Sequence, residues 1–360
     1  MPAGPGSVTQ SSSFRALREL AAVIIAVVTV GMTAQTKAWK SVVGLISVIG
    51  AIIAGVGIYH KSIAAKSVWL VDEWHAGSFF APYIYNANAA SLMNLSCALS
   101  LGFFFGQRKG PKSEIYRGLW LINSLICGIG VMAAGSKGAI IILVVMLLAT
   151  LFLNQKRLLR LTKIEGESKY LAWEKRMMLA GITALILGFG LVASQNLVSR
   201  TQELYSQVTE DGYSESIGGR TAIMGLMLDM IKPSEGGWPG FGPGSFRHIV
   251  PYFAVKPEFN VKGSWHHGHC DPLQTVVEWG YFGAAAWFTF GIGAVIAGMR
   301  TLSRKSISSS DRPLIRSVMI ALAATGLHSC FDFPLSIYSI HLCAMLLCGI
   351  LWGLYGKKAA

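Results

Sequence analysis

Residues 41–59 read SVVGLISVIGAIIAGVGIY, an apolar run without a single charged side chain. About 20 helical residues cross the hydrocarbon core of a bilayer, and this run has a similar length and a suitable composition. Backbone N–H and C=O groups find no partners in lipid, so the run is expected to be a helix rather than a strand. The stretch therefore predicts a membrane-spanning α-helix.

The whole chain follows the same pattern, because 52% of its 360 residues are hydrophobic and only 14% are charged. This composition argues against a soluble globular domain and predicts an all-α, polytopic transmembrane helical bundle. We expect about nine spans, near residues 17–35, 41–59, 87–106, 116–134, 138–154, 177–196, 277–299, 314–332 and 336–356.

These spans define the expected regions of the chain. They are a polar leader (1–16), N-terminal membrane helices (17–196) with an external loop (60–86), a large external loop (197–276), C-terminal membrane helices (277–356) and a tail (357–360). The large loop is expected to contain short helices, because residues 220–231 place four apolar side chains on one helical face, namely Ile223, Leu226, Met227 and Met230.

The net charge of +13 is explained by topology and needs no nucleic-acid partner. Segments 107–117, 154–176 and 300–316 carry net charges of +3, +4 and +4, whereas the large loop has six basic and eight acidic residues, a net charge of −2. Basic short loops face the cytoplasm, so alternation places the large loop outside and the tail inside. The start of the first span, flanked by Arg15 and Arg18, then also lies outside, against this rule. We therefore expect a chain that lacks some N-terminal spans, although a miscounted span would explain the same observation.

Histidines gather near the end of the large loop, where residues 266–271 read HHGHCD. Their spacing matches no standard zinc signature, so no metal or other cofactor is expected. An imidazole such as that of His269 can instead serve as a general base, because histidine titrates near neutral pH. The alternative is a polar loop with incidental histidines. Cys270 and Cys330 both fall near the outer face, where an oxidising compartment would allow a disulfide.

Two cations are candidates to bind an anion at the membrane surface. Lys137 lies in the segment GSKG, residues 135–138, between two spans on the outer side. A lysine in this position either snorkels or meets an anion. Arg220 lies at the expected start of the loop helix, where a forked guanidinium and a helix N-terminus both favour oxyanions. A plain surface arginine is the alternative reading.

His328 and Asp332 stand four residues apart near the outer end of the span at 314–332. Ionisable residues within a span are functional candidates. Helical spacing also lets the two side chains pair with each other. A structural role and a catalytic role therefore both remain open.

These motifs, in this order, resemble the O-antigen ligase and polymerase family of bacterial envelope glycosyltransferases, over roughly residues 40–356. Each motif is weak alone, but their joint order is fairly specific. The matching positions are Asn88, Ser136-Lys137-Gly138, Arg220, Gly240 to Phe246 (with Gly242 and Gly244), His269 to Gln274 (with Asp271), Glu278 with Gly280, and His328 to Leu335 (with Asp332).

The chain departs from the family pattern in three ways. Lys137 stands where an arginine is usual, which keeps the charge but loses the forked contact to a phosphate. Cys270 and Pro272 replace the common Asn and Tyr after the histidine, which affects expected acceptor contacts. Fewer spans precede the Asn88 segment than the family generally has.

The resemblance implies glycan transfer from an undecaprenyl-diphosphate carrier to an acceptor hydroxyl, at the periplasmic face of the bacterial inner membrane. The acceptor would be lipid A core, a protein or a growing polysaccharide. Arg220 and Lys137, with Ser136, would bind the diphosphate, and Arg220 and His269 would carry catalysis as a direct, inverting displacement without metal. The supporting positions would be Asn88, Gly242, Gly244, Asp271, Gln274, Glu278, His328 and Asp332.

Two other classes of protein remain as alternatives. A flippase or transporter of lipid-linked glycans is expected to hold charged residues deep in several spans, often at broken helices. Here the expected spans have apolar interiors and the polar groups gather on one face, which favours an enzyme. A metal-binding sensor would leave Arg220 and the glycine-rich turn unexplained. Ligase and polymerase are not separated, because both use the same donor and differ in acceptor.

Overall fold

Residues 9–68, 79–107, 111–162, 215–235, 238–255 and 265–357 are described by the structure, a computed structural model of the chain. All regular elements within these ranges are helices, which confirms the expected all-α, polytopic architecture. The long helices are α1 (Gln10–Thr33), α2 (Trp39–Ser62), α3 (Asn86–Gly106), α4 (Pro111–Ala134), α5 (Lys137–Thr162), α9 (Asp271–Ser303), α10 (Asp311–Ser329) and α11 (Tyr338–Gly356). The short ones are α7 (Glu215–Met230), α8 (Phe246–Ala254) and the 3-10 helices η1 (Pro233–Glu235) and η3 (Pro334–Ser336).

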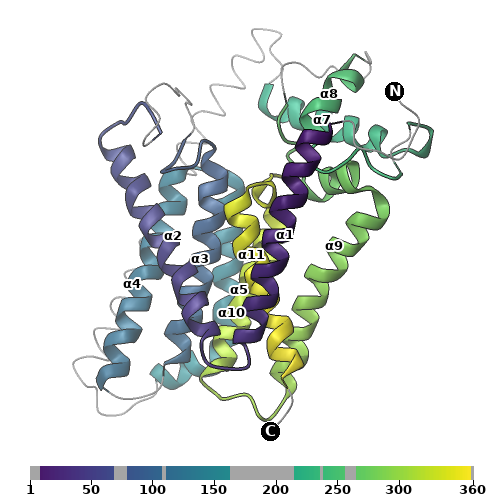
Figure 1. The fold of residues 1–360 in the computed structure, drawn as a ribbon. Helices are drawn as coiled ribbons and strands as arrows, with labels where there is room; N and C mark the ends of the chain where they lie inside the picture. The colour runs from purple at the N-terminus through teal and green to yellow at the C-terminus, as the bar shows by residue number, and fades with distance from the viewer. Residues whose placement is uncertain are drawn as a thin grey trace.

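The long helices form one bundle, and α7 and α8 gather at one end of it, which we call the loop end (Figure 1). The start of α1 lies at the same end, because Ser13 donates a hydrogen bond to the Pro243 carbonyl oxygen at 2.9 Å and Ser12 Oγ lies 3.2 Å from His248 Nε2. The start of the first span thus lies on the same side as residues 243–248 of the large loop. α1 starts at Gln10, so the helix includes residues that were expected in the polar leader.

Seven helices in the described part of the chain are long and apolar enough to cross a membrane, namely α1 to α5, α9 and α11. α10 occupies the expected span at 314–332 but is less apolar, with Asp311, Arg312 and Arg316 in its first turns. It packs against α3, α5 and α9, so other helices rather than lipid cover much of its surface. The span expected at 177–196 lies outside the described residues.

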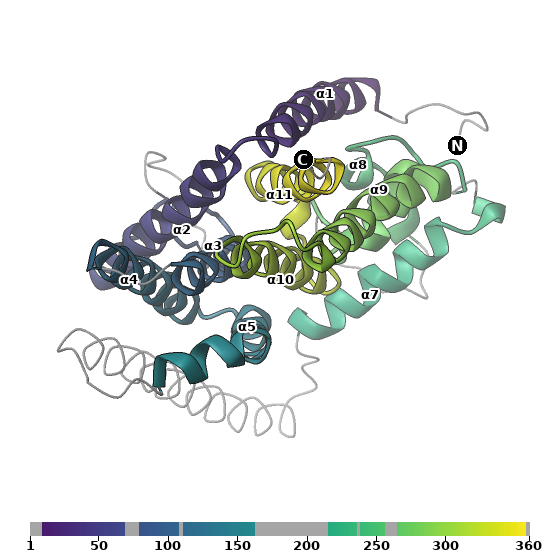
Figure 2. The same cartoon turned by 90° about the horizontal axis from the view of Figure 1, so that it is seen from below.

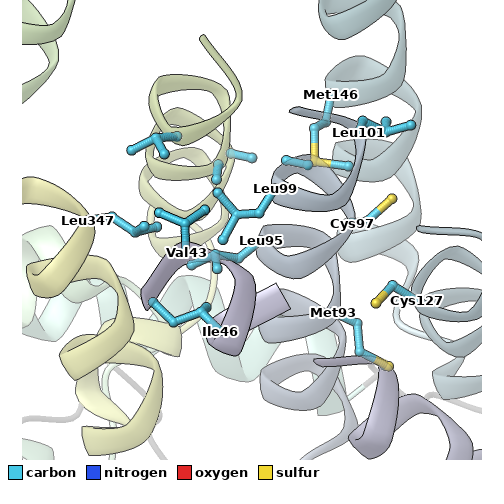
Figure 3. Close-up of a cluster of buried hydrophobic side chains, with 14 of the residues drawn as sticks. Val43, Ile46, Met93, Leu95, Cys97, Leu99, Leu101, Cys127, Met146 and Leu347 are labelled. Atoms are coloured by element: carbon cyan, nitrogen blue, oxygen red, sulfur yellow. The ribbon is translucent and has the colours of Figure 1, made fainter. Parts of the chain in front are cut away.

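α3 is the central helix, because it packs against α2, α4, α5 and α10 and is buried along most of its length. Small residues let these helices approach closely. A Cβ on Gly50 of α2 would overlap Ser96 of α3, and one on Gly102 of α3 would overlap Ser317 of α10. Apolar side chains fill the remaining space, including Val43 and Ile46 of α2, Leu95 and Leu99 of α3 and Leu347 of α11 (Figure 3).

The boundary expected between the large loop and the following span, at residue 276, differs from the structure. α9 already begins at Asp271, with Pro272 in its first turn, a position that suits proline. Gly280 then interrupts the helix, with φ of 68° and ψ of −179°, a conformation that glycine adopts readily. Residues 271–279 therefore form a separate short segment, and the long run of α9 follows Gly280.

Gly50→Ala is expected to destabilise the protein, whereas Gly55→Ala is expected to be tolerated. Alanine is the better helix former at both positions, by roughly 1 kcal/mol. Only at Gly50 does the new methyl group overlap a neighbouring side chain, since Gly55 faces open space. Overpacking of this kind costs about 1–3 kcal/mol. Thermal unfolding of both purified variants in one detergent measures the difference, and a Gly50→Ala midpoint at or above that of Gly55→Ala would contradict this packing.

Candidate active site

Residues from four distant segments meet at the loop end of the bundle. Tyr85 precedes α3, Arg220 lies in α7, His269 precedes α9, and Asp332 follows α10. Arg220 donates a hydrogen bond from Nη2 to the Tyr85 hydroxyl oxygen. The Tyr85 ring meets the His269 ring edge-on, with centroids 5.8 Å apart. Three of the residues singled out from the sequence, Arg220, His269 and Asp332, therefore lie in one place.

Aromatic rings and an unusual backbone conformation hold the His269 side chain. Its φ is 50°, in the left-handed region that residues other than glycine rarely adopt. Besides Tyr85, the rings of Trp265 and Phe333 lie perpendicular to it, with centroids 5.6 and 4.7 Å away. The side chain is only 15% exposed. Backbone strain of this kind persists where the surroundings enforce it, and it concentrates at functional sites.

Asp332 is the acidic neighbour of His269. Its Oδ1 lies 3.3 Å from His269 Nδ1 and accepts a hydrogen bond from the Phe333 N–H at 3.0 Å. The contact to Nδ1 lies within ion-pair distance but lacks hydrogen-bond geometry, and such contacts often tighten when substrate binds. A carboxylate at Nδ1 favours the tautomer that carries its proton there, which leaves the lone pair on Nε2.

His328 is the second imidazole beside this carboxylate. Its Nε2 lies 4.0 Å from Asp332 Oδ2, so the i,i+4 pair expected from the sequence is the longer of the two histidine contacts. The side chain is almost completely buried, and neither ring nitrogen has a hydrogen-bond partner within the described ranges. The Phe331 ring packs on it, with centroids 5.4 Å apart.

The sequence predicted Arg220 at the start of the loop helix, and the structure shows that this prediction is wrong. α7 begins at Glu215, so Arg220 lies in the second turn, away from the N–H groups that are unpaired at a helix N-terminus. Its guanidinium is instead positioned by Tyr85. The apolar face expected for this helix is confirmed, because its four members are fully buried: Ile223, Leu226, Met227 and Met230.

Lys137 is the first residue of α5, and its side chain is exposed. The preceding Ser136 accepts a hydrogen bond on Oγ from the Ala139 N–H at 3.4 Å. Gly138 packs on the segment that carries Asp332, since a Cβ there would lie 2.6 Å from the Phe331 ring. No hydrogen bond or ion pair joins Lys137 to the other site residues in the described part of the chain. The start of α5 is thus a neighbour of the site rather than one of its contacting groups.

The glycine-rich turn adopts left-handed backbone conformations that glycine permits. The φ values of Gly240, Gly242 and Gly244 are 81°, 102° and 73°. Gly240 lies directly against Gly280, and a Cβ on either residue would overlap the backbone of the opposite segment. The Phe241 N–H donates to the Val277 carbonyl oxygen at 2.9 Å. The turn is therefore joined to α9 through backbone contact.

Glu278 and Gln274 tie this turn to the histidine segment. Glu278 accepts hydrogen bonds from the Gly244 N–H at 2.7 Å, the Phe246 N–H at 3.3 Å and Gln274 Nε2 at 3.1 Å. Gln274 Oε1 in turn accepts the Gly268 N–H at 2.9 Å. Both side chains therefore hold backbone segments in place, and none of these four hydrogen bonds involves the side chains of Tyr85, His269 or Asp332.

Asp271 connects the same segment to the turn after α10. Its carboxylate accepts hydrogen bonds from the Leu335 N–H at 2.7 Å, the Ser336 N–H at 3.1 Å and the Ser336 hydroxyl at 2.6 Å. These bonds satisfy the first N–H groups of η3. They hold residues 332–336 beside residues 269–271, which brings Asp332 to His269.

Sequence reasoning missed the aromatic residues Tyr85, Trp265 and Phe333. A tyrosine just before a membrane span suits an interfacial belt, so Tyr85 has no distinguishing sign in the sequence. It lies three residues before Asn88, which is buried and has no partner for its Oδ1 in the described residues. Burial raises the pKa of Tyr85, as does Asp332, while Arg220 lowers it. Tyr85 thus stays a neutral hydroxyl that can accept from the arginine.

His267, another member of the histidine cluster, has a packing role. His267 stacks on Phe333, with centroids 4.5 Å apart and ring planes 11° apart. No group of three histidine, cysteine, aspartate or glutamate side chains converges as metal ligands would within the residues described. All six cysteines are free thiols, so Cys270 and Cys330 form no disulfide in this structure.

The stability of the protein is expected to fall as the pH drops from about 6.5 to about 4, in part through His267. Burial lowers the pKa of His267 from 6.5 to about 4, with smaller effects from nearby positive groups. The unfolded chain therefore binds a proton in this window that the folded chain excludes. His267→Phe keeps the stacked ring and removes this proton, so its unfolding temperature should fall less between about pH 7 and about pH 5. Identical pH dependence in the wild type and in His267→Phe would contradict this role.

Comparison with known proteins gives one family and no individual relative. Residues 122–288 match the family model for O-antigen ligase. None of the curated proteins matches the chain. The matched stretch contains Arg220, the glycine-rich turn, His269 and Glu278, which lie at the loop end, and also Lys137 at the neighbouring start of α5. The match supports the assignment of this chain to the O-antigen ligase family.

Proposed function

We propose that this protein transfers a glycan from an undecaprenyl-diphosphate carrier to an acceptor hydroxyl, in the manner of an O-antigen ligase or polymerase. The observation that carries the proposal is the meeting of Arg220, His269 and Asp332, which come from three separate parts of the chain. A cation suited to an anion and a potential general base both contact Tyr85 there. The family match supports a glycosyltransferase-like enzyme in general.

In the proposed reaction, the acceptor hydroxyl oxygen attacks the anomeric carbon of the donor sugar. The bond from this carbon to the diphosphate oxygen breaks, and the electron pair leaves with the diphosphate. His269 takes the hydroxyl proton on Nε2. Arg220, with Lys137 and Ser136 nearby at the start of α5, neutralises the negative charge that develops on the leaving oxygen. Direct displacement inverts the anomeric centre, and the donor supplies its own leaving group, so no nucleotide or metal cofactor is part of the proposal.

Asp332 and Tyr85 position the two reacting groups in this scheme. Asp332 holds the His269 proton on Nδ1 and stabilises the imidazolium that forms when Nε2 accepts the second proton. Tyr85 accepts a hydrogen bond from Arg220 and so orients one edge of the guanidinium. The remaining guanidinium N–H groups can then address phosphate oxygens.

The carrier lipid requires the site to lie at the surface of a bilayer. We propose the bacterial inner membrane, with the loop end on the periplasmic side, where lipid-linked glycans are presented. The net charge of −2 on the large loop and the basic segments at the other ends of the spans support this orientation. The acceptor is a glycan or a lipid A core, and no nucleic acid takes part.

Arg220→Ala and His269→Ala are each expected to lower the transfer rate by about 10²-fold or more, the usual effect of removing a charge-stabilising group or a general base. His266→Ala is the matched control, because this histidine lies in the same segment but is exposed. Transfer is measured in membranes with a lipid-linked donor, and protein amounts are measured by immunoblot. Wild-type rates in both Arg220→Ala and His269→Ala would remove the proposed mechanism.

Asp332→Asn is expected to lower kcat by roughly 10²-fold or more, with little change in KM, because the amide no longer stabilises the imidazolium. Asp332→Glu keeps the charge and should recover part of the rate. An equal kcat in the wild type and in Asp332→Asn, at matched protein amounts, would contradict this positioning role.

A further inference from the structure

A cavity of about 480 Å³ lies against α11, between α1 and α9, and also touches α10. Figure 2 shows α1 and α9 on two sides of α11. The cavity is separate from the candidate active site, because Tyr85, Arg220, His269 and Asp332 do not line it. It therefore needs an explanation of its own.

The wall of this cavity is apolar along the membrane-crossing helices. Polar side chains occur mainly towards its loop end, where they bond within the protein. Thr275 donates to the Asp271 carbonyl oxygen at 2.7 Å, and Ser329 donates to the Gly326 carbonyl oxygen at 2.7 Å. The apolar lining includes Leu20 and Val23 of α1, Ile292 and Val295 of α9, Leu322 of α10 and Met345 of α11.

Two glycines in the cavity wall are not explained by helix packing. Gly291 of α9 and Gly326 of α10 both line the cavity, and a Cβ on either residue would meet no atom within 4 Å. By contrast, Gly293 and Gly298 of α9 are needed for close approach, since a Cβ there would lie 2.6 Å from Trp352 and 2.9 Å from Met319. A glycine within a helix costs about 1 kcal/mol relative to alanine. At Gly291 and Gly326 the absence of a side chain enlarges the cavity and does not bring two helices closer together.

The charges around the cavity restrict what can occupy it. Within the described ranges no lysine or arginine lines it, whereas Glu19, Asp271 and Glu278 do. A diphosphate head group would therefore meet carboxylates. Arg15 of α1 pairs with Glu19 at 3.0 Å, so a cation lies beside one of these carboxylates at the loop end. This pair of opposite charges complements a head group with one phosphate and one ammonium.

We propose that the cavity binds an acyl chain of a zwitterionic bilayer phospholipid, which lies against Gly291 and Gly326 with its head group at the start of α1. The helices α1 and α9 are both apolar enough to cross a membrane, and α1 packs on α11 rather than along α9. The cavity thus adjoins the hydrocarbon of the bilayer. The site also accounts for Arg15, which stands at the loop end against the usual distribution of charge. It does not depend on the proposed transfer reaction.

Native mass spectrometry of the purified full chain tests this site. The wild type is expected to retain a bound phospholipid after detergent extraction. Gly291→Leu and Gly326→Leu, which fill the cavity from two walls, should each lose it. Gly55→Leu is the matched control, because Gly55 also faces open space but lies on α2, and it should retain the lipid. Thermal unfolding of each variant before and after addition of phosphatidylethanolamine vesicles gives a second readout, in which only the wild type and Gly55→Leu should be stabilised.

Three results would overturn the proposal. The first is a wild-type protein that retains no lipid and does not respond to the vesicles. The second is a retained lipid that is polyprenyl rather than a phospholipid. The third is equal retention in the wild type and in the filled variants. If Gly291→Leu does not fold, Gly326→Leu decides alone, because it enters the cavity from a different helix.

Discussion

The backbone contact between Gly240 and Gly280 joins the large loop to the membrane helices, and the geometry of the site depends on it. A side chain at either position would separate the two segments. Glu278, next to this contact, accepts the N–H groups of the glycine turn, so the junction is closed by hydrogen bonds as well as by shape. Through Gln274 the same junction reaches Gly268, the residue before the proposed base.

A second joint brings the end of α10 to the loop. Asp271 bonds the first N–H groups of η3, and this places Asp332 and Phe333 against His269. The imidazole is then enclosed by rings, with a carboxylate at Nδ1 and a strained backbone beneath it. The enclosing rings fix the orientation of the imidazole before substrate binds, which suits the proposed role of His269 as a base. The lipid cavity on the other side of residues 271–279 would support the same segment from within the membrane.

The apolar runs predicted most of the membrane helices, because the length and composition of a span are fixed by the bilayer rather than by tertiary contacts. The buried face of α7 also followed from its spacing alone. The break in α9 at Gly280 was not predicted, because a glycine in an apolar run gives no local sign that another backbone segment packs against it. Arg220 was placed at a helix start because the preceding glycines resemble a boundary, whereas the helix continues through them.

The sequence predicted which charged and imidazole residues belong to the candidate site, but not how they are arranged in space. Arg220, His269 and Asp332 stood out by type, whereas Tyr85 and Phe333 are ordinary aromatic residues whose role arises only from contacts across the fold. Their ring planes lie 18° apart with centroids at 5.2 Å, which forms one wall of the site. Contacts between residues so far apart in the chain carry no signal in a single sequence.

The most direct test of the account is an experimental structure of the full chain with a lipid-linked glycan diphosphate bound in a membrane mimetic. The account predicts the diphosphate beside Arg220, with Lys137 turned towards it and the anomeric carbon of the sugar facing His269 Nε2. A diphosphate bound at the opposite end of the bundle, or in the cavity between α1 and α9, would contradict it.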